Sequence, residues 1–184
     1  MRSPEEVHRN FPGGPVLVVG DSHTWMAGAG KQYPDWDTDC RAGRTTAEGL
    51  GVVADSLESR HRVVVFDQAT NDGLVPAERH WQELTELRAL LGRRQLVLVS
   101  SWRLDVSLEH VVANQRRLAT QEPATTSVAD WADFVSSHRQ YFADDHLHFT
   151  DEAMPIRTGI VWAAVRAAEL RAAASPARRL PWRG

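Results

Sequence analysis

Three short apolar runs constrain the fold of this chain more than any other feature of its sequence. They occupy residues 15–19, 62–66 and 95–99, and in each of them apolar and mostly β-branched residues follow one another without alternation. Continuous runs of this length are typical of parallel strands that helices cover on both faces. Weaker strands are expected at residues 36–40 and 126–130. The sequence therefore predicts a five-stranded sheet with a buried interior.

Helical patterns fill the intervals between these strands, over residues 45–59, 76–91, 107–120 and 150–173. The second begins with a proline, which suits the first turn of a helix, and a glycine follows its end. Regular alternation of strands and helices predicts an α/β fold, a three-layer α/β/α sandwich around a parallel sheet. A chain of 184 residues is long enough for one such domain and short for two.

The expected domain covers residues 15–174, between a polar N-terminal extension at 1–14 and a mobile Pro/Arg-rich tail at 175–184. The extension has no apolar leader, and no stretch approaches the ~18 apolar residues of a membrane span. These features predict a cytoplasmic protein without membrane insertion, or a secreted one if the chain is part of a longer protein. The net charge of -3 gives no reason to expect nucleic acid as a partner.

The lone cysteine, Cys40, excludes an intrachain disulfide. It falls in one of the weaker strands, where we expect it to act as a small buried hydrophobe and not as a nucleophile.

Polar residues follow the strands at the edge of the sheet where ligands bind in folds of this kind. Gly20, Asp21 and Ser22 come directly after the first strand. The glycine allows a tight turn, and the free N–H groups at a helix start suit a serine nucleophile whose reaction generates an oxyanion. Asp21 or Ser22 could instead only cap the helix.

Two further turns contain potential hydrogen-bond donors. Gly43 precedes a predicted helix, and its backbone N–H could point into the same cleft as Ser22. Asn71 follows the central strand and could donate its side-chain N–H there. Both residue types are also common in ordinary turns, so neither is decisive alone.

The segment before the last helix contains Asp145 and His148, three residues apart. In one turn the carboxylate can bond Nδ1 of the histidine, which leaves Nε2 to take a proton from serine. The alternative is a metal site formed by His146, His148 and the neighbouring carboxylates. No further cluster of ligands is evident, so we expect neither a metal nor another cofactor.

The order of these motifs resembles the SGNH (GDSL-like) hydrolase family, which has a Gly-Asp-Ser start, a glycine, an asparagine and a late Asp-x-x-His. The resemblance spans about residues 15–170 and implies a flavodoxin-like sandwich. It implies that Ser22, His148 and Asp145 form a catalytic triad. It also implies an oxyanion hole formed by the backbone N–H groups of Ser22 and Gly43 and the side chain of Asn71.

The chain departs from the family pattern at two positions. His23 replaces the usual leucine, and Ala69 replaces a glycine two residues before the asparagine. We expect His23 to face solvent in the first turn of its helix; the alternatives are that it changes the pocket entrance or tunes Ser22. His23, Trp25 and Trp102 are the candidates for contact with substrate, although core or rim packing is the commoner role of a tryptophan.

A weaker resemblance links the chain to the SGNH domains of cell-wall O-acetyltransferases, through Gly43-Arg44, Trp102 with Asn114, and Asp130-Trp131. The sequence therefore predicts a serine esterase that acts on a short-chain, acetyl-type ester of a small molecule or carbohydrate. The alternatives are an O-acetyltransferase acting on a carbohydrate and a non-catalytic carbohydrate-binding module. A nucleotide-binding site is not expected, since no glycine-rich phosphate motif is present.

Overall fold

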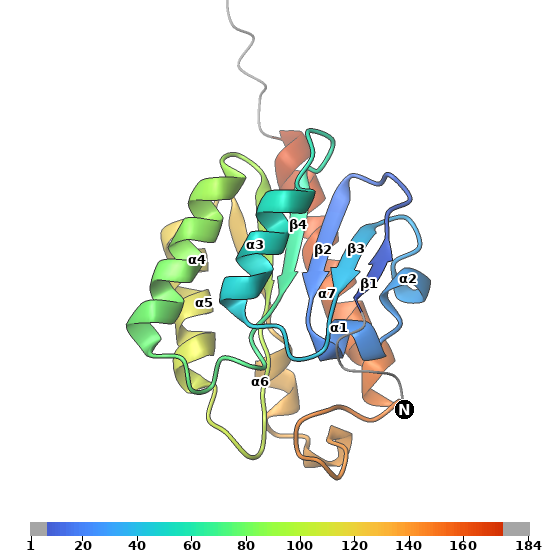
Figure 1. Cartoon of the computed structure of the whole chain (residues 1–184), viewed down its shortest axis with the longest axis vertical. Coiled ribbons are helices and arrows are strands. Elements are labelled where there is room, and N and C mark those ends of the chain that lie inside the picture. The colour runs from blue at the N-terminus through green and yellow to red at the C-terminus, as the bar shows by residue number, and fades with distance from the viewer. Residues whose placement is uncertain (1–6, 175–184) are drawn as a thin grey trace, which may run out of the picture.

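The computed structural model describes residues 7–174, which form a six-stranded sheet between layers of helices (Figure 1). The strands are β1 (His8–Asn10), β2 (Val16–Gly20), β3 (Asp37–Cys40), β4 (Val63–Asp67), β5 (Gln95–Val99) and β6 (Thr126–Ala129). The helices are α1 (Ser22–Met26), α2 (Ala29–Gln32), α3 (Thr46–Ser56), α4 (Ala77–Leu91), α5 (Glu109–Gln121), α6 (Trp131–Val135) and α7 (Ala153–Ala174), with a 3₁₀ turn, η1, at Arg139–Tyr141. The tail expected at 175–184 lies outside the described residues.

The order of the strands across the sheet is β1-β3-β2-β4-β5-β6. Strands β2 to β6 are parallel, as predicted, and their order is that of the flavodoxin-like sheet. The expected five strands gain a sixth, because β1 pairs antiparallel with the edge of β3. Its side chains are mostly exposed, so its sequence has no apolar pattern, and backbone bonding to a free edge does not require one.

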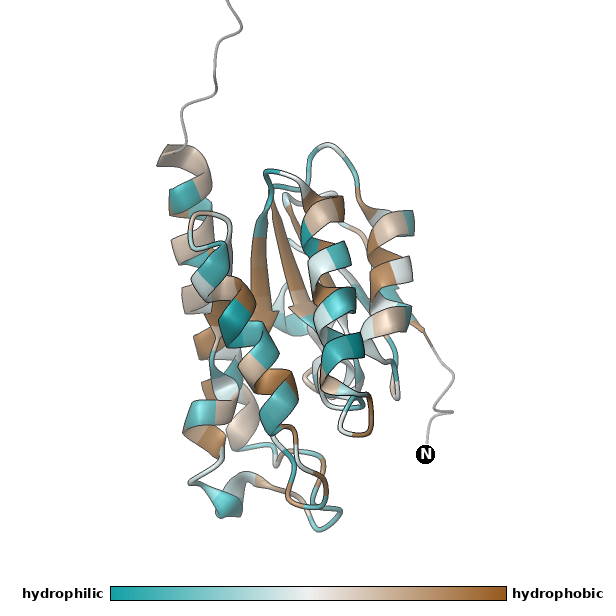
Figure 2. Ribbon diagram, turned by 90° about the vertical axis from the view of Figure 1, so that its left-hand side faces the viewer, coloured by the Kyte–Doolittle hydropathy of each residue, from teal (hydrophilic) through white to brown (hydrophobic). Residues whose placement is uncertain are grey.

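Two apolar layers explain the continuous apolar strands. Side chains such as Leu17 and Phe66 point from one face of the sheet toward α3, α4 and α5, and Val18 and Val65 point from the other toward α7. Successive residues of a strand point to opposite faces of the sheet. Because helices cover both faces, odd- and even-numbered residues of each strand must be apolar. Figure 2 shows the hydrophobic strands enclosed between helices whose outer faces are hydrophilic.

The four predicted helices are confirmed as α3, α4, α5 and α7. Helix α3 begins with a capping box in which the Thr45 side chain accepts from the backbone of Glu48 and the Glu48 carboxylate accepts from the backbone of Thr45. The helix expected to start at Ser22 is α1, which is five residues long. The short helices α2 and α6 were not predicted, because four or five residues are too few to show a period of 3.6. Between residues 7 and 174, no helix has both the length and the hydropathy that crossing a bilayer requires.

Candidate active site

Three side chains form a hydrogen-bonded series at the carboxyl edge of the sheet: Ser22, His148 and Asp145. Ser22 is the first residue of α1, directly after β2, and its Oγ is 3.1 Å from Nε2 of His148. Nδ1 of the same imidazole is 2.6 Å from Oδ2 of Asp145. The serine and histidine are 126 residues apart in sequence. The parallel sheet brings them together because β2 and the loop that precedes α7 reach the same edge.

The side chain of Asp145 bonds the backbone of the same loop that carries it and His148. Its Oδ1 accepts hydrogen bonds from the backbone N–H groups of Leu147, at 3.0 Å, and His148, at 2.8 Å. Burial opposes ionisation of Asp145, but the hydrogen bonds from His148 and Leu147 outweigh it and lower its pKa to about 2. The carboxylate is therefore charged at neutral pH, and it can stabilise a positive imidazolium.

His146, between these two residues, has a φ of 61° and an exposed side chain. The metal site considered for this segment has no support in residues 7–174, where no group of three His, Cys, Asp or Glu side chains is arranged to hold an ion.

Gly43 and Asn71 lie in the turns after β3 and β4, the two strands that flank β2. Gly43 has a φ of 74°, a conformation that glycine adopts without strain. The buried guanidinium of Arg44 fixes the turn by donating to the carbonyls of Gly20, at 3.2 Å, and Asp39, at 2.9 Å. Nδ2 of Asn71 donates to the carbonyl of Arg44 at 2.9 Å. Two turns with potential oxyanion donors are thus bonded to each other.

His23 does not face solvent, and the expectation that it would is wrong. Its side chain is completely buried, and its Nε2 donates to the carbonyl oxygen of Leu147 at 3.1 Å. Its Nδ1 lies 3.0 Å from the hydroxyl of Thr70 and 3.4 Å from that of Ser101. Burial is the main reason that its pKa lies well below the ordinary value, so the ring is neutral. A buried ring with both nitrogens engaged has no surface for contact with substrate.

Trp25 and Trp102 are both half-buried. Trp25 packs edge-to-face on His8, with the ring centroids 5.4 Å apart, and lines a cavity of about 540 Å³ beside β1 and α2. Trp102 packs on an apolar cluster that includes Trp131 and Phe149, next to His148. Contact with substrate stays a prediction for both.

Two of the residues behind the weaker resemblance, Asn114 and Asp130, have hydrogen-bond partners within the fold. Nδ2 of Asn114 donates to the carbonyl of Ala77 at 2.7 Å and so joins α5 to α4. Asp130 accepts from the backbone N–H of Asp133 at the start of α6 and pairs with Arg116. Both side chains have bonds that stabilise the fold away from Ser22.

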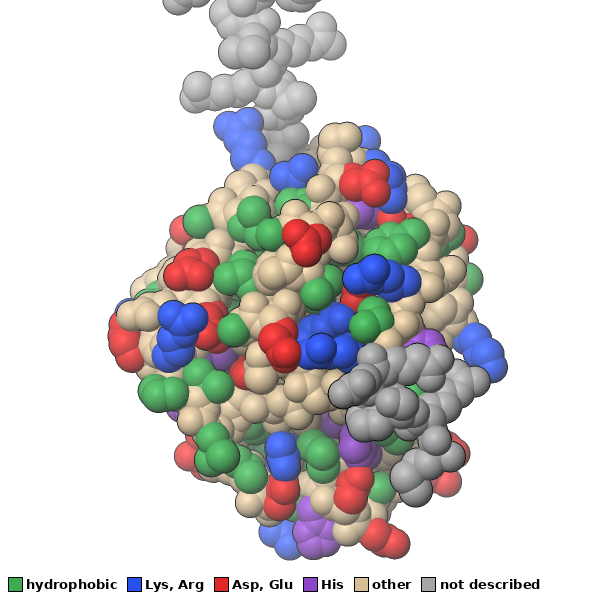
Figure 3. All heavy atoms as spheres, viewed as in Figure 1, with side chains coloured by type: hydrophobic (Ala, Val, Ile, Leu, Met, Phe, Trp, Pro, Cys, Tyr) green, Lys and Arg blue, Asp and Glu red, His purple; other side chains and the backbone are tan. Residues whose placement is uncertain are grey.

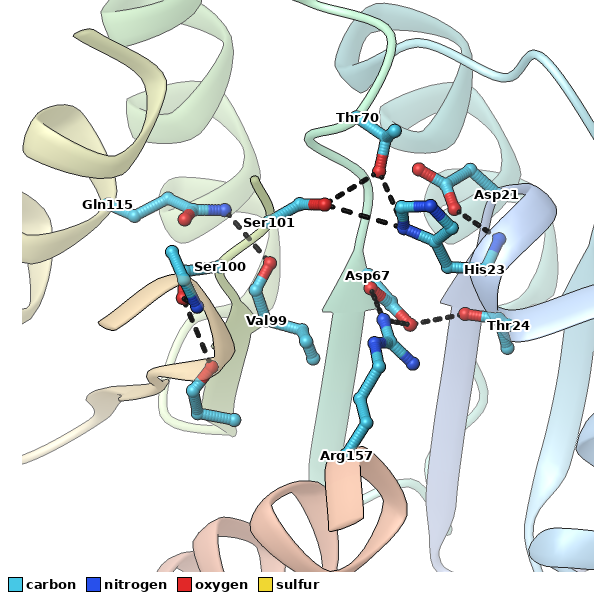
Figure 4. A network of polar contacts seen from close by, with 12 residues as sticks. Asp21, His23, Thr24, Asp67, Thr70, Val99, Ser100, Ser101, Gln115 and Arg157 are labelled. Atoms are coloured by element: carbon cyan, nitrogen blue, oxygen red, sulfur yellow. Dashed lines mark hydrogen bonds and ion pairs between the residues drawn. The ribbon is translucent and has the colours of Figure 1, made fainter. Parts of the chain in front are cut away.

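An ionic cluster beneath α1 was missed by the sequence analysis. Arg157 of α7 lies 2.6 Å from both carboxylate oxygens of Asp67, which also accepts from the hydroxyl of Thr24 (Figure 4). Asp21 is buried close by, and burial together with the charge of Asp67 raises its pKa to about 7. The sequence feature that could have revealed this cluster is Arg157, because it interrupts the apolar face that residues such as Ala153 and Val161 form on α7.

Charges of both signs are interspersed over the face of the molecule that α3 and α4 form (Figure 3). This distribution agrees with the small net charge.

Comparison with known proteins depends on the fold alone, since neither a family model nor a curated protein matches this sequence. Among solved structures, the C-terminal catalytic domain of peptidoglycan O-acetyltransferase A from Streptococcus pneumoniae is 18% identical, with a TM-score of 0.73. The match covers 85% of this chain and 94% of that domain. AlinE4, an SGNH-hydrolase family esterase, is 18% identical, with a TM-score of 0.52 over 84% of this chain and 96% of its own.

The chain has the SGNH hydrolase fold. A carbohydrate esterase of family 3 from Talaromyces cellulolyticus has the same architecture, at 16% identity and a TM-score of 0.61, over 87% of this chain and 99% of that one. The neighbours with the SGNH fold thus include esterases and an acyltransferase domain.

Proposed function

We propose that this chain is a serine esterase that hydrolyses short-chain, acetyl-type esters through an acyl-enzyme, with Ser22 as nucleophile. The observation that carries the proposal is the continuous hydrogen-bonded series from Asp145 through His148 to Ser22, with atom pairs at 2.6 and 3.1 Å. Both distances are within hydrogen-bond range, and the 3.1 Å between Nε2 and Oγ allows the base to take the proton of the nucleophile. His148 is half-buried, and Ser22 at the start of α1 is buried, with 5% of its surface exposed.

In the first step, His148 Nε2 takes the hydroxyl proton as Ser22 Oγ attacks the ester carbonyl carbon. Asp145 stays ionised and balances the charge of the imidazolium. The backbone N–H groups of Ser22 and Gly43 and the amide of Asn71 donate to the oxyanion of the tetrahedral intermediate. An amide carries two N–H groups, so Asn71 can bond Arg44 and the oxyanion together.

Collapse of the intermediate breaks the ester C–O bond, and His148 returns the proton to the leaving alcohol. Water then attacks the acyl-Ser22 ester by the same route and restores the free serine. The proposed substrates are acetyl-type esters of small molecules or carbohydrates. The fold neighbour that is a carbohydrate esterase supports this class, and we assign Trp102, which packs on the cluster that contains Phe149, as a border of the acyl or sugar group.

The test is turnover of a chromogenic acetate ester by the wild-type chain and by Ser22→Ala. The substitution removes only the hydroxyl and should leave the thermal unfolding midpoint almost unchanged while turnover falls to the background rate. Covalent labelling by a fluorophosphonate should likewise require Ser22. Undiminished turnover by the folded variant would refute the assignment. Absence of labelling in the wild type would favour a non-catalytic binding module.

A carbohydrate O-acetyltransferase is the second candidate. It is favoured by the TM-score of 0.73 to the peptidoglycan O-acetyltransferase domain. The acyl-enzyme would be the same, and a sugar hydroxyl would replace water in the second step. Acetylated chitooligosaccharide formed faster than free acetate, from the same donor ester, would select this alternative over hydrolysis.

A further inference from the structure

The loop that carries Asp145 and His148 depends on a small number of polar contacts for its position. The Asp145 side chain is half exposed, so burial alone does not fix it. Three backbone carbonyls of this segment accept hydrogen bonds: His146 from the N–H of Leu104 at 3.0 Å, His148 from the N–H of Ala143 at 2.8 Å, and Leu147 from a side chain. The last contact is central, because Leu147 lies between Asp145 and His148.

The side chain that bonds Leu147 is that of His23, which neighbours Ser22 in α1. We propose that His23 is a positioning residue: its Nε2–H holds the Leu147 carbonyl and thereby keeps His148 within reach of Ser22. This inference rests on the proposed function. It accounts for the departure from leucine at this position, since leucine has no group that can donate to a carbonyl.

The tautomer of His23 follows from its partners. A carbonyl oxygen can only accept, so Nε2 must carry the proton and Nδ1 must accept. The hydroxyls of Thr70 and Ser101, in the turns after β4 and β5, lie 3.0 and 3.4 Å from Nδ1. Thr70 donates to Ser101 at 3.0 Å, so the O–H of Ser101 is left to donate to Nδ1. Figure 4 shows this triangle of two hydroxyls and one ring above the strand ends. The ring is thus held from both sides.

The neutrality of His23 suits its place beside the base. Its ring meets that of His148 edge-to-face, with the centroids 5.7 Å apart, and it packs on Phe149 at 4.4 Å. A charged ring at this distance would oppose formation of the His148 imidazolium in the first step. A neutral imidazole provides the donor for Leu147 without that repulsion.

A matched pair of substitutions tests the role of Nε2. The amide nitrogen of His23→Gln can reach the place of Nε2, and the shorter side chain of His23→Asn can reach only that of Nδ1. We expect kcat for the acetate ester to fall about 100-fold in His23→Asn, since a displacement of about 1 Å in a catalytic group has this effect. His23→Gln should retain most of the wild-type kcat, and KM should stay unchanged in both.

The control is His61→Asn, because His61 is likewise buried, with Nδ1 2.9 Å from the N–H of Glu58 and Nε2 3.0 Å from Asp37, and it precedes β4 at the edge of the sheet opposite to Ser22. It should lower the thermal unfolding midpoint without lowering kcat. If His23→Asn does not fold, the double variant Thr70→Val/Ser101→Ala removes both hydroxyls beside Nδ1 of the ring and should lower kcat at unchanged KM.

Wild-type kcat in His23→Asn or in the double variant would overturn the inference, and so would equal losses in the folded Asn and Gln variants. These outcomes are distinct from failure of the proposed function, which Ser22→Ala reports separately.

Discussion

Replacement of Arg157 by methionine should strongly destabilise the fold, and the size of the effect follows from the surroundings of the guanidinium. Arg157 is 1% exposed, and one of its nitrogens contacts both oxygens of Asp67 at 2.6 Å. Methionine fills much of the same volume but leaves Asp67 buried without a counter-charge, beside Asp21. Loss of one partner of a buried pair costs about 3–5 kcal/mol. At about 2–4 °C per kcal/mol, the unfolding midpoint should fall by about 6–20 °C.

The assay is urea unfolding of the wild type and Arg157→Met at pH 7 and pH 5. Lower pH lets a proton neutralise the uncompensated carboxylate, so the difference in free energy of unfolding should shrink at pH 5. The double variant Asp67→Asn/Arg157→Met removes both charges, keeps an acceptor for Thr24, and should recover part of the loss. The reasoning is refuted if Arg157→Met loses less than about 1 kcal/mol, or if the double variant is no more stable than the single one.

Two further predictions concern the groups beside the nucleophile. Because the pKa of Asp21 is raised by burial and by Asp67 to about 7, the folded protein retains a proton that the unfolded chain releases near pH 4. The free energy of unfolding should therefore fall as pH rises from about 4 to about 7, by up to about 1.4 kcal/mol per pH unit. In urea unfolding, Asp21→Asn should flatten this dependence. A variant whose free energy of unfolding falls with pH as steeply as that of the wild type would contradict the prediction. Asn71→Ala should lower kcat about 10²–10³-fold at similar KM by removing an oxyanion donor, and a change in KM alone, from steady-state kinetics, would assign Asn71 to binding.

Much of the fold could be predicted from the sequence because its signals are local. The apolar runs at 15–19, 62–66 and 95–99 report burial on both faces of a strand, and the intervening helices are long enough to show their period. The order of the site motifs also sufficed to select Ser22 and His148 as partners. Parallel strands end at one edge, so residues that follow successive strands converge there whatever their separation in sequence.

Only the tertiary structure decided the surroundings of individual side chains. His23 was expected in solvent because it follows Ser22 in a first helical turn, yet its ring is covered by a loop 124 residues later in the chain. The pair of Arg157 and Asp67 spans 90 residues, and β1 became a strand only because β3 offered a free edge. Sequence patterns report which face of an element is buried, but the partners of a buried polar group come from elements that no local pattern can identify.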